Sequence, residues 1–292
     1  MSVQTNADNS FPSNPNLLIN PDFKINQRGV TSWTGSNIGV DCWKSWNQLA
    51  YVQDDGIKIV AGTTENPTSG CIEQYIEGIK EGSVITFSAS VNGVVYSCTG
   101  KVIFDNGYCV AGYHGDILNM DIITRKCKVV IPRIWLHNLG EQSVVEGTSV
   151  VVNWAKLEYG NHATLFVPPN PTLEFMKCQR YYQLYFGNDL ESLIRVPGEV
   201  VFKGRLKAPM YSRPSVSLLK SSLTVFESYN LRGYRSSESI ITSYNIHTGN
   251  QNQSIHYIQV NGFTDFTTMG TPLIVDSADP LFALTSDIVL TD

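Results

Sequence analysis

The stretch VITFSASVNG, residues 84 to 93, alternates apolar and polar side chains along most of its length. This period of two is typical of a strand, because successive side chains in an extended chain point to opposite faces of the sheet. The apolar residues are Ile85, Phe87, Ala89 and Val91, and the hydroxyl residues are Thr86, Ser88 and Ser90. Asn92 and Gly93 follow, and this dipeptide favours the positive φ angles of a tight hairpin turn. The stretch therefore predicts an antiparallel hairpin with one face turned inward.

Similar strand patterns occur on both sides of this hairpin. KCKVVIPRIWLHNLG at 126–140 and TSVVVNWAKLEYG at 148–160 are rich in β-branched and aromatic residues, as is SLTVFESY at 222–229. Many short strands separated by turn residues favour sandwiches of the jelly-roll kind. We therefore expect an all-β protein with two β-sandwich (jelly-roll-like) domains joined by one short α-helix.

The joining helix is predicted just after the proline-rich segment PPNP. Asn170 can cap the helix, Pro171 suits its first position, and Glu174 lies near the positive end of the dipole. An apolar stripe follows at helical spacing, which predicts a helix over 171–186. The stripe consists of Phe175, Cys178, Tyr182 and Tyr185. It packs either on its own domain or against copies of the chain near a symmetry axis.

These signals divide the chain of 292 residues into four parts. Residues 1–16 are polar and proline-containing, which indicates an extended attachment arm. Residues 17–167 form the first predicted sandwich, residues 168–187 form the hinge and linker helix, and residues 188–292 form the second sandwich.

The charge balance argues against nucleic acid as a partner. The chain has 21 basic and 26 acidic residues, a formal charge of −5, and no basic run that would follow a phosphate backbone. Neither a secretory signal nor an apolar run of membrane-spanning length is evident. The six cysteines lack a C-x-x-C pair, so we interpret them as reduced thiols. We expect a soluble protein made in a cytoplasm, without membrane insertion.

Catalytic motifs are lacking in this sequence. It contains no nucleophile elbow, Walker loop, zinc-protease helix or dinucleotide-binding fingerprint. The histidines are isolated, and each suits a loop or packing position better than a catalytic one. Acidic pairs such as Glu73 with Glu77 and Asp116 with Asp121 are the remaining candidates, for glycoside hydrolysis, but such acids are usually solvated charges. We therefore predict a protein that is not an enzyme.

Aromatic residues crowd the first third of the chain, where TSWTGSNIGVDCWKSWNQLAY at 31–51 mixes rings with amide, hydroxyl and carboxylate side chains. A sugar presents an apolar C–H face and a rim of hydroxyls, so its site needs an aromatic platform edged by polar groups. Trp43 and Trp154 suit core positions. The candidate glycan-binding residues are Trp33, Trp46, Tyr51 and Tyr75. The alternative is that these rings only pack.

Three segments resemble a family of tail fibre or receptor-binding proteins of tailed bacteriophages and prophages. They are NLLINPDFKINQRG at 16–29, VDCWKSW at 40–46 and NWAKLEYGNHATLFVPPNPTLEFMKCQRYYQ at 153–183. APMYSRPSVSL at 208–218 is similar to a phrase in the family's C-terminal domain. The resemblance implies a virion appendage with a jelly roll like that of carbohydrate-binding modules, often homotrimeric, that attaches the particle to the bacterial surface.

The resemblance also implies partners and a metal. The partners are a bacterial surface glycan and other virion proteins, the latter through residues 1–16. The related modules carry a structural calcium, and the matching positions are Asn20, Asp22 and Glu158. Two alternatives remain: a purely structural connector, baseplate or capsid decoration protein without glycan binding, and, less favoured, a depolymerase that cleaves the glycan.

Overall fold

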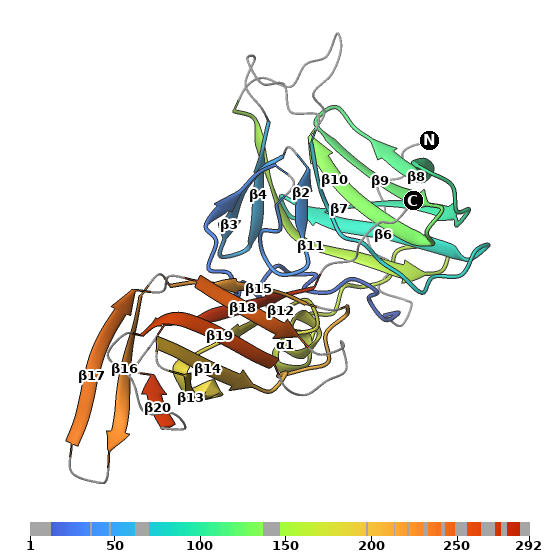
Figure 1. Cartoon of the computed structure of the whole chain (residues 1–292). Helices are drawn as coiled ribbons and strands as arrows, with labels where there is room; N and C mark the ends of the chain where they lie inside the picture. Colours follow the sequence, from blue (N-terminus) through green and yellow to red (C-terminus); the bar gives the residue numbers. More distant parts are fainter. Residues whose placement is uncertain are drawn as a thin grey trace. The chain divides into compact units, whose positions relative to one another are not determined.

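The fold is built almost entirely from antiparallel sheets (Figure 1). The structure, a computed structural model, describes residues 13–35, 37–46, 48–61, 70–136, 147–196, 198–212, 214–220, 222–229, 233–240, 243–248, 256–263, 272–275 and 279–286. Its single α-helix within these ranges confirms the all-β, sandwich-like prediction. The chain forms two compact units, and the boundary falls between Cys178 and Gln179.

The first unit contains two facing sheets. The six-stranded sheet has the order β1 (Ser32–Trp33), β3 (Leu49–Gln53), β4 (Gly56–Val60), β11 (Ser149–Tyr159), β6 (Val84–Val91) and β7 (Val94–Lys101). The five-stranded sheet has the order β2 (Lys44–Trp46), β5 (Cys71–Glu73), β10 (Val129–Leu136), β9 (Leu118–Arg125) and β8 (Tyr108–His114). Neighbouring strands far apart in sequence, such as β11 beside β6, make this a sandwich of non-local pairings.

The predicted hairpin is present as β6 and β7. Val91 is paired with Val94, and the turn residues Asn92 and Gly93 have φ values of 50° and 79°. The apolar side of β6 lies in the core, as expected. Its hydroxyl side is also buried, where Thr86 Oγ1 lies 2.8 Å from Thr99 Oγ1 and donates to Gly160 O at 2.9 Å.

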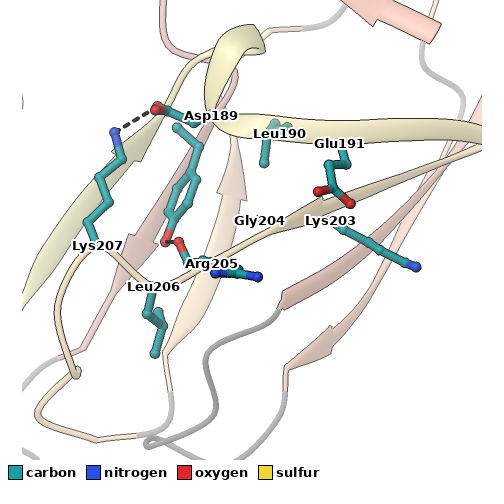
Figure 2. A pocket seen from close by; sticks show the side chains of 9 residues that line it. Asp189, Leu190, Glu191, Lys203, Gly204, Arg205, Leu206 and Lys207 are labelled. Atoms are coloured by element: carbon teal, nitrogen blue, oxygen red, sulfur yellow. Dashed lines mark hydrogen bonds and ion pairs between the residues drawn. The ribbon is translucent and has the colours of Figure 1, made fainter. Parts of the chain in front are cut away.

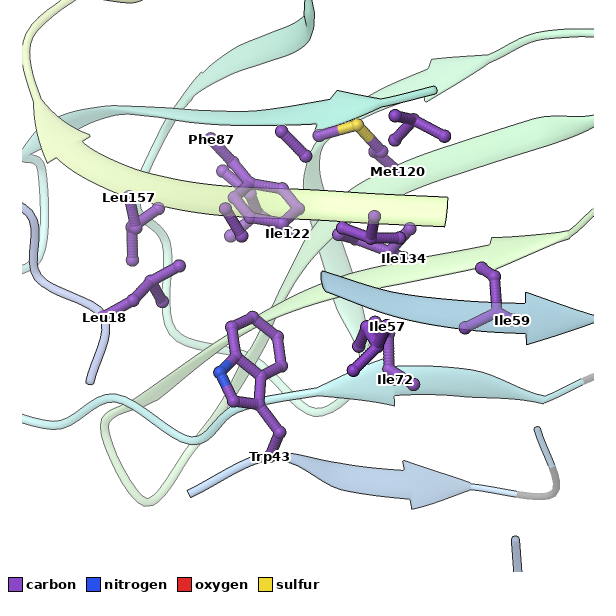
Figure 3. Packing of buried hydrophobic residues seen from close by; sticks show 14 of the residues in the cluster. Leu18, Trp43, Ile57, Ile59, Ile72, Phe87, Met120, Ile122, Ile134 and Leu157 are labelled. Carbon is purple, nitrogen blue, oxygen red and sulfur yellow. The ribbon is translucent and has the colours of Figure 1, made fainter. Parts of the chain in front are cut away.

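The core lies between the two sheets and is dominated by aliphatic side chains with a few rings (Figure 3). Trp43 is fully buried there, as predicted; its ring lies 4.9 Å from that of Phe23, and its Nε1 donates to Asn20 O at 2.9 Å. Trp154 is different. It is half-buried outside this core cluster, and its ring stacks on Phe166 at 4.5 Å, so its predicted core position is wrong.

The segment after residue 12 is bound to the first unit. β4 pairs with β11 only over Ser149–Val152, and the backbone groups of the rest of β11 need other partners on that edge. Asn16 supplies two of them, because its Nδ2 donates to Ala155 O and its Oδ1 accepts from Leu157 N. The last four residues of the predicted arm 1–16 are therefore part of the sandwich, whereas its first twelve lie outside the described residues.

The helix α1 (Pro171–Cys178) is shorter than predicted. Its start is as expected, since Asn170 Oδ1 accepts from the backbone N–H groups of Thr172 and Leu173 at 3.0 and 3.2 Å. Its buried side chains are Glu174 and Cys178, and Glu174 Oε1 accepts from Asn20 N at 2.7 Å. α1 thus belongs to the first unit, and the predicted helix over 171–186 is wrong beyond Cys178.

Tyr182 and Tyr185 lie in a strand, β12 (Tyr182–Tyr185), of the second unit. There they pair with Thr285 and Phe282, about a hundred residues later in the sequence. The helical spacing of the predicted stripe Phe175, Cys178, Tyr182 and Tyr185 was therefore coincidental beyond Cys178. Tyrosine favours strands, and pairing with a distant strand outweighed the local pattern.

The second unit also contains two antiparallel sheets. The three-stranded sheet has the order β12, β21 (Phe282–Thr285) and β15 (Ser215–Leu218). The seven-stranded sheet has the order β17 (Gly233–Ile240), β16 (Ser222–Tyr229), β20 (Pro272–Val275), β13 (Leu190–Val196), β14 (Gly198–Gly204), β19 (His256–Phe263) and β18 (Ser243–Thr248). Phe202 and Phe282 join the two sheets, with ring centroids 5.5 Å apart.

A short 3₁₀ helix, η1 (Gly187–Asp189), connects β12 to β13. A search of the described residues for helices with the length and apolar character to cross a membrane found none.

Candidate functional site

The outer face of the five-stranded sheet brings polar and aromatic side chains from five strands together. Met120, Ile122 and Ile134 of this sheet point into the core. Because side chains alternate along a strand, their neighbours Asp121 and Arg133 point outward. We call this outer surface the β10 face, and it comprises Lys44, Trp46, Cys71, Glu73, Tyr75, Asp121, Arg133, Trp135, Asn119, Gly112 and His114.

Charges of alternating sign cross the β10 face in one row. Lys44 of β2 lies opposite Glu73 of β5, and Glu73 lies opposite Arg133 of β10. Arg133 in turn lies opposite Asp121 of β9, and Asp121 opposite Gly112 of β8. Opposite charges at directly facing positions stabilise the pairing of strands. The row therefore supports the pairing of four strands and presents polar groups at defined positions.

Arg133 and Asp121 form the most ordered part of the row. Arg133 donates from Nε and Nη2 to the two carboxylate oxygens of Asp121, at 2.7 and 2.6 Å. The Asp121 side chain is 3% exposed and the Arg133 side chain 22%, so Arg133 is the more accessible partner of the pair. Burial by itself lowers the pKa of Arg133, but the hydrogen bond and charge of Asp121 raise it above its usual value. Arg133 is therefore a fixed cation.

Glu73 orients the side chains at the other end of the row. Its Oε1 accepts a hydrogen bond from the Tyr75 hydroxyl at 3.0 Å, and its Oε2 accepts from the Cys71 thiol at 3.5 Å. Burial, and then the charge of Glu73, raises the pKa of Tyr75 and of Cys71 well above their usual values. Both groups are therefore neutral donors, and the Lys44 ammonium lies 5.3 Å from the centre of the Tyr75 ring.

Two tryptophans and a polar pair lie in the next row of the face, on one side of the charged row. Trp46 is 52% exposed on β2, and the half-buried Trp135 on β10 has the Arg133 guanidinium 4.8 Å from its ring centre. His114 Nδ1 lies 3.1 Å from Asn119 Oδ1, at the β8 side of the face. The β10 face thus combines aromatic rings with fixed hydrogen-bonding groups, an arrangement that suits a ligand with both apolar and hydroxylated surfaces.

The predicted aromatic residues divide among three environments. Trp46 and Tyr75 lie on the β10 face. Tyr51 is 38% exposed on β3, which belongs to the other sheet. Trp33 is 6% exposed, and a Cβ at Gly39 would lie only 2.0 Å from its indole, so no ring face is open to a ligand. The prediction that Trp33 belongs to an exposed platform is therefore wrong.

Sequence reasoning missed Arg133, Trp135, Asn119 and His114, and treated Glu73 and Asp121 as solvated charges. A signal was available in IPRIWL, where Arg133 and Trp135 alternate with aliphatic residues and so share the outer side of a strand. Their partners come from other strands, so the constellation itself required the strand order.

The residues predicted to bind calcium have other partners. Asn20 donates to Ile25 O and Asp41 O and accepts from Ile25 N. Glu158 is fully buried and accepts from Thr164 N at 2.9 Å and from its hydroxyl at 2.5 Å. Asp22 is half-buried. No cluster of three or more histidine, cysteine, aspartate or glutamate residues that could hold a metal occurs in the part of the chain that the structure describes.

The outward side of α1 is apolar. Cys178 is buried beside Cys42, whose thiol has its pKa raised chiefly by a hydrogen bond with Cys178 and by burial. Away from this buried side of the helix, Leu173 is 60% exposed, Met176 53% and Phe175 40%. These three residues form an exposed apolar patch, which we call the α1 patch.

Comparisons of the chain with protein-family models, curated proteins and solved structures found no match. The resemblance to phage tail fibre and receptor-binding proteins therefore stays a prediction from the sequence segments that carry it.

Proposed function

We propose that this protein is a non-enzymatic component of a bacteriophage virion that attaches to the bacterial surface by binding carbohydrate. The observation that carries the proposal is the β10 face, where Trp46 and Trp135 lie on one side of the charged row Lys44–Glu73–Arg133–Asp121. The resemblance of residues 16–29, 40–46 and 153–183 to tail fibre proteins supports its location on the virion.

Each part of the β10 face has a role in binding a sugar. The rings of Trp46 and Trp135 cover the apolar C–H face of a pyranose. The part of the Arg133 guanidinium that is not bonded to Asp121 donates hydrogen bonds to sugar hydroxyls, and the Tyr75 oxygen, whose proton is bonded to Glu73, accepts one. The internal bonds to Asp121 and Glu73 hold these groups in place before the sugar arrives, which reduces the entropy lost on binding.

Removing either tryptophan is expected to weaken glycan binding about ten-fold or more. The variants Trp46→Ala and Trp135→Ala each lose one stacking surface. In nucleic-acid binding, an aromatic side chain stacked on a base contributes on the order of 1–3 kcal/mol to the binding free energy, and we expect a comparable loss here. Binding is measured by sedimentation with insoluble bacterial cell walls and by titration with their solubilised polysaccharides. Tyr51→Ala is the matched control, since it removes an exposed aromatic from the other sheet.

The outcome separates the competing functions. Equal binding by the wild type, both tryptophan variants and the Tyr51 control would contradict the β10 face as the site. Absence of any binding by the wild type across cell walls of several bacteria would favour the structural connector. Release of reducing ends from the polysaccharide would instead indicate a depolymerase.

We further propose that the chain forms a homotrimer through the α1 patch, because weak single sites gain from being linked on one particle. Light scattering should give three times the chain mass of 32.4 kDa. The double variant Leu173→Glu/Met176→Glu places charges on the patch and should give the mass of one chain. Ile117→Glu, an exposed residue between β8 and β9, should leave the mass unchanged. A monomeric wild type, or an unchanged double variant, would refute this interface.

A further inference from the structure

The second unit contains a hollow of about 530 Å³ that the proposed function does not use (Figure 2). Its lining comes from β12, η1, β13, β14 and the segment that follows β14. Its polar lining residues are Tyr185, Asp189, Glu191, Lys203, Arg205 and Lys207. This volume lies within the range of small-molecule sites and suits a ligand the size of a sugar or a small acid.

Hydrogen bonds from β12 hold the wall of the hollow in position. The buried Tyr185 hydroxyl lies 2.8 Å from Gln183 Oε1 and 2.9 Å from Arg205 O, and its one proton is shared between these two acceptors. The backbone N–H of Lys207 donates to the same Gln183 oxygen at 3.0 Å. The main chain from Arg205 to Lys207 is thus held at both ends beside the hollow, and Arg205 belongs to its lining.

One ion pair of the hollow is already complete. Lys207 Nζ lies 2.7 Å from Asp189 Oδ2, and this carboxylate also accepts from Phe186 N at 2.9 Å. The Lys207 ammonium lies 5.4 Å from the centre of the Tyr185 ring. Asp189 therefore has the partners it needs and leaves no negative charge to balance the other cations.

The remaining charges leave an excess cation. Glu191 lies opposite Lys203 in the β13–β14 ladder, so the charges of these two side chains cancel. Arg205 has no carboxylate partner within 4.0 Å among the described residues, although the whole chain has a formal charge of −5. A positive site in an acidic protein favours an anion.

We propose that this hollow binds a small polar ligand through one anionic group, a carboxylate or a phosphate, held by Arg205. The planar guanidinium matches either group with two parallel hydrogen bonds. Because the hollow lies wholly within the second unit, this site is independent of the β10 face.

The test is isothermal titration calorimetry of the whole chain with three separate probes: inorganic phosphate, glucuronate and uncharged glucose. We expect saturable binding of phosphate, of glucuronate or of both, and much weaker binding of glucose. Comparing the two anions shows whether the site prefers a phosphate or a carboxylate. Arg205→Gln should weaken binding of the anion about ten-fold or more, since it removes a positive charge and the paired donors that face the anionic group. Lys203→Gln should have a smaller effect.

Lys220→Gln is the matched control, because it removes the same charge from the second unit outside the hollow, where Lys220 pairs with Asp279. An equal loss of affinity in Lys220→Gln and Arg205→Gln would overturn the proposal by showing general screening. Failure of both anions to bind saturably would also overturn it. Trp46→Ala should bind the anion as tightly as the wild type does. This variant therefore distinguishes binding in the hollow from binding at the β10 face.

Discussion

Replacing Trp43 by alanine is expected to lower the free energy of unfolding of the first unit by about 3–5 kcal/mol. Trp43 is fully buried between the sheets, and its ring packs on Phe23. The variant loses the burial of the largest core side chain and leaves a cavity. It also leaves Asn20 O without the indole N–H that donates to it at 2.9 Å. Urea unfolding followed by circular dichroism measures the change.

Two further variants separate the contributions to this effect. Trp43→Phe keeps most of the ring but removes the N–H donor, so it should cost less than Trp43→Ala. Trp46→Ala removes a tryptophan three residues away that is 52% exposed, and its effect should stay within about 0.5 kcal/mol. Similar losses for Trp43→Ala and Trp46→Ala would contradict the assignment of one ring to the core and the other to the surface.

Replacing Glu158 by alanine is expected to lower the free energy of unfolding by about 3–5 kcal/mol. Glu158 and Lys156 are both buried on β11, with Lys156 Nζ 3.3 Å from Glu158 Oε2. Removing the carboxylate leaves a buried ammonium without its counter-charge and leaves the Thr164 N–H without its acceptor. Chemical denaturation of the variant and the wild type gives the difference.

The control for this prediction is an ion pair at the surface. Lys126 and Asp105 lie 3.6 Å apart with both side chains more than half exposed, so Lys126→Ala should change stability by less than about 1 kcal/mol. Adding calcium tests the role of Glu158 in a second way. The Glu158 carboxylate contacts Thr164 and Lys156, so calcium is not expected to stabilise the wild-type protein through this residue. A rise in the wild-type unfolding midpoint on adding calcium would contradict this structural role.

Local patterns predicted local features correctly. The alternation over 84–91 and the Asn92-Gly93 turn are recognisable without the rest of the chain, because strand period and turn geometry depend on neighbouring residues alone. The same holds for the cap at Asn170. The end of the helix was predicted wrongly because Tyr182 pairs with Thr285, a partner that no nearby residue indicates.

In the candidate site, too, local patterns identified some residues, but the set that comes together depends on pairing between distant strands. Composition and motifs by themselves predicted an all-β protein with exposed aromatic residues, and two of the aromatic residues they singled out, Trp46 and Tyr75, lie on the β10 face. Only the tertiary structure decided that Trp33 is enclosed, that Tyr51 lies on the other sheet, and that Arg133 joins Glu73 and Asp121. The physical reason is that the order and register of strands are set by burial of the whole core, whereas a sequence pattern specifies only which side of its own strand each residue occupies.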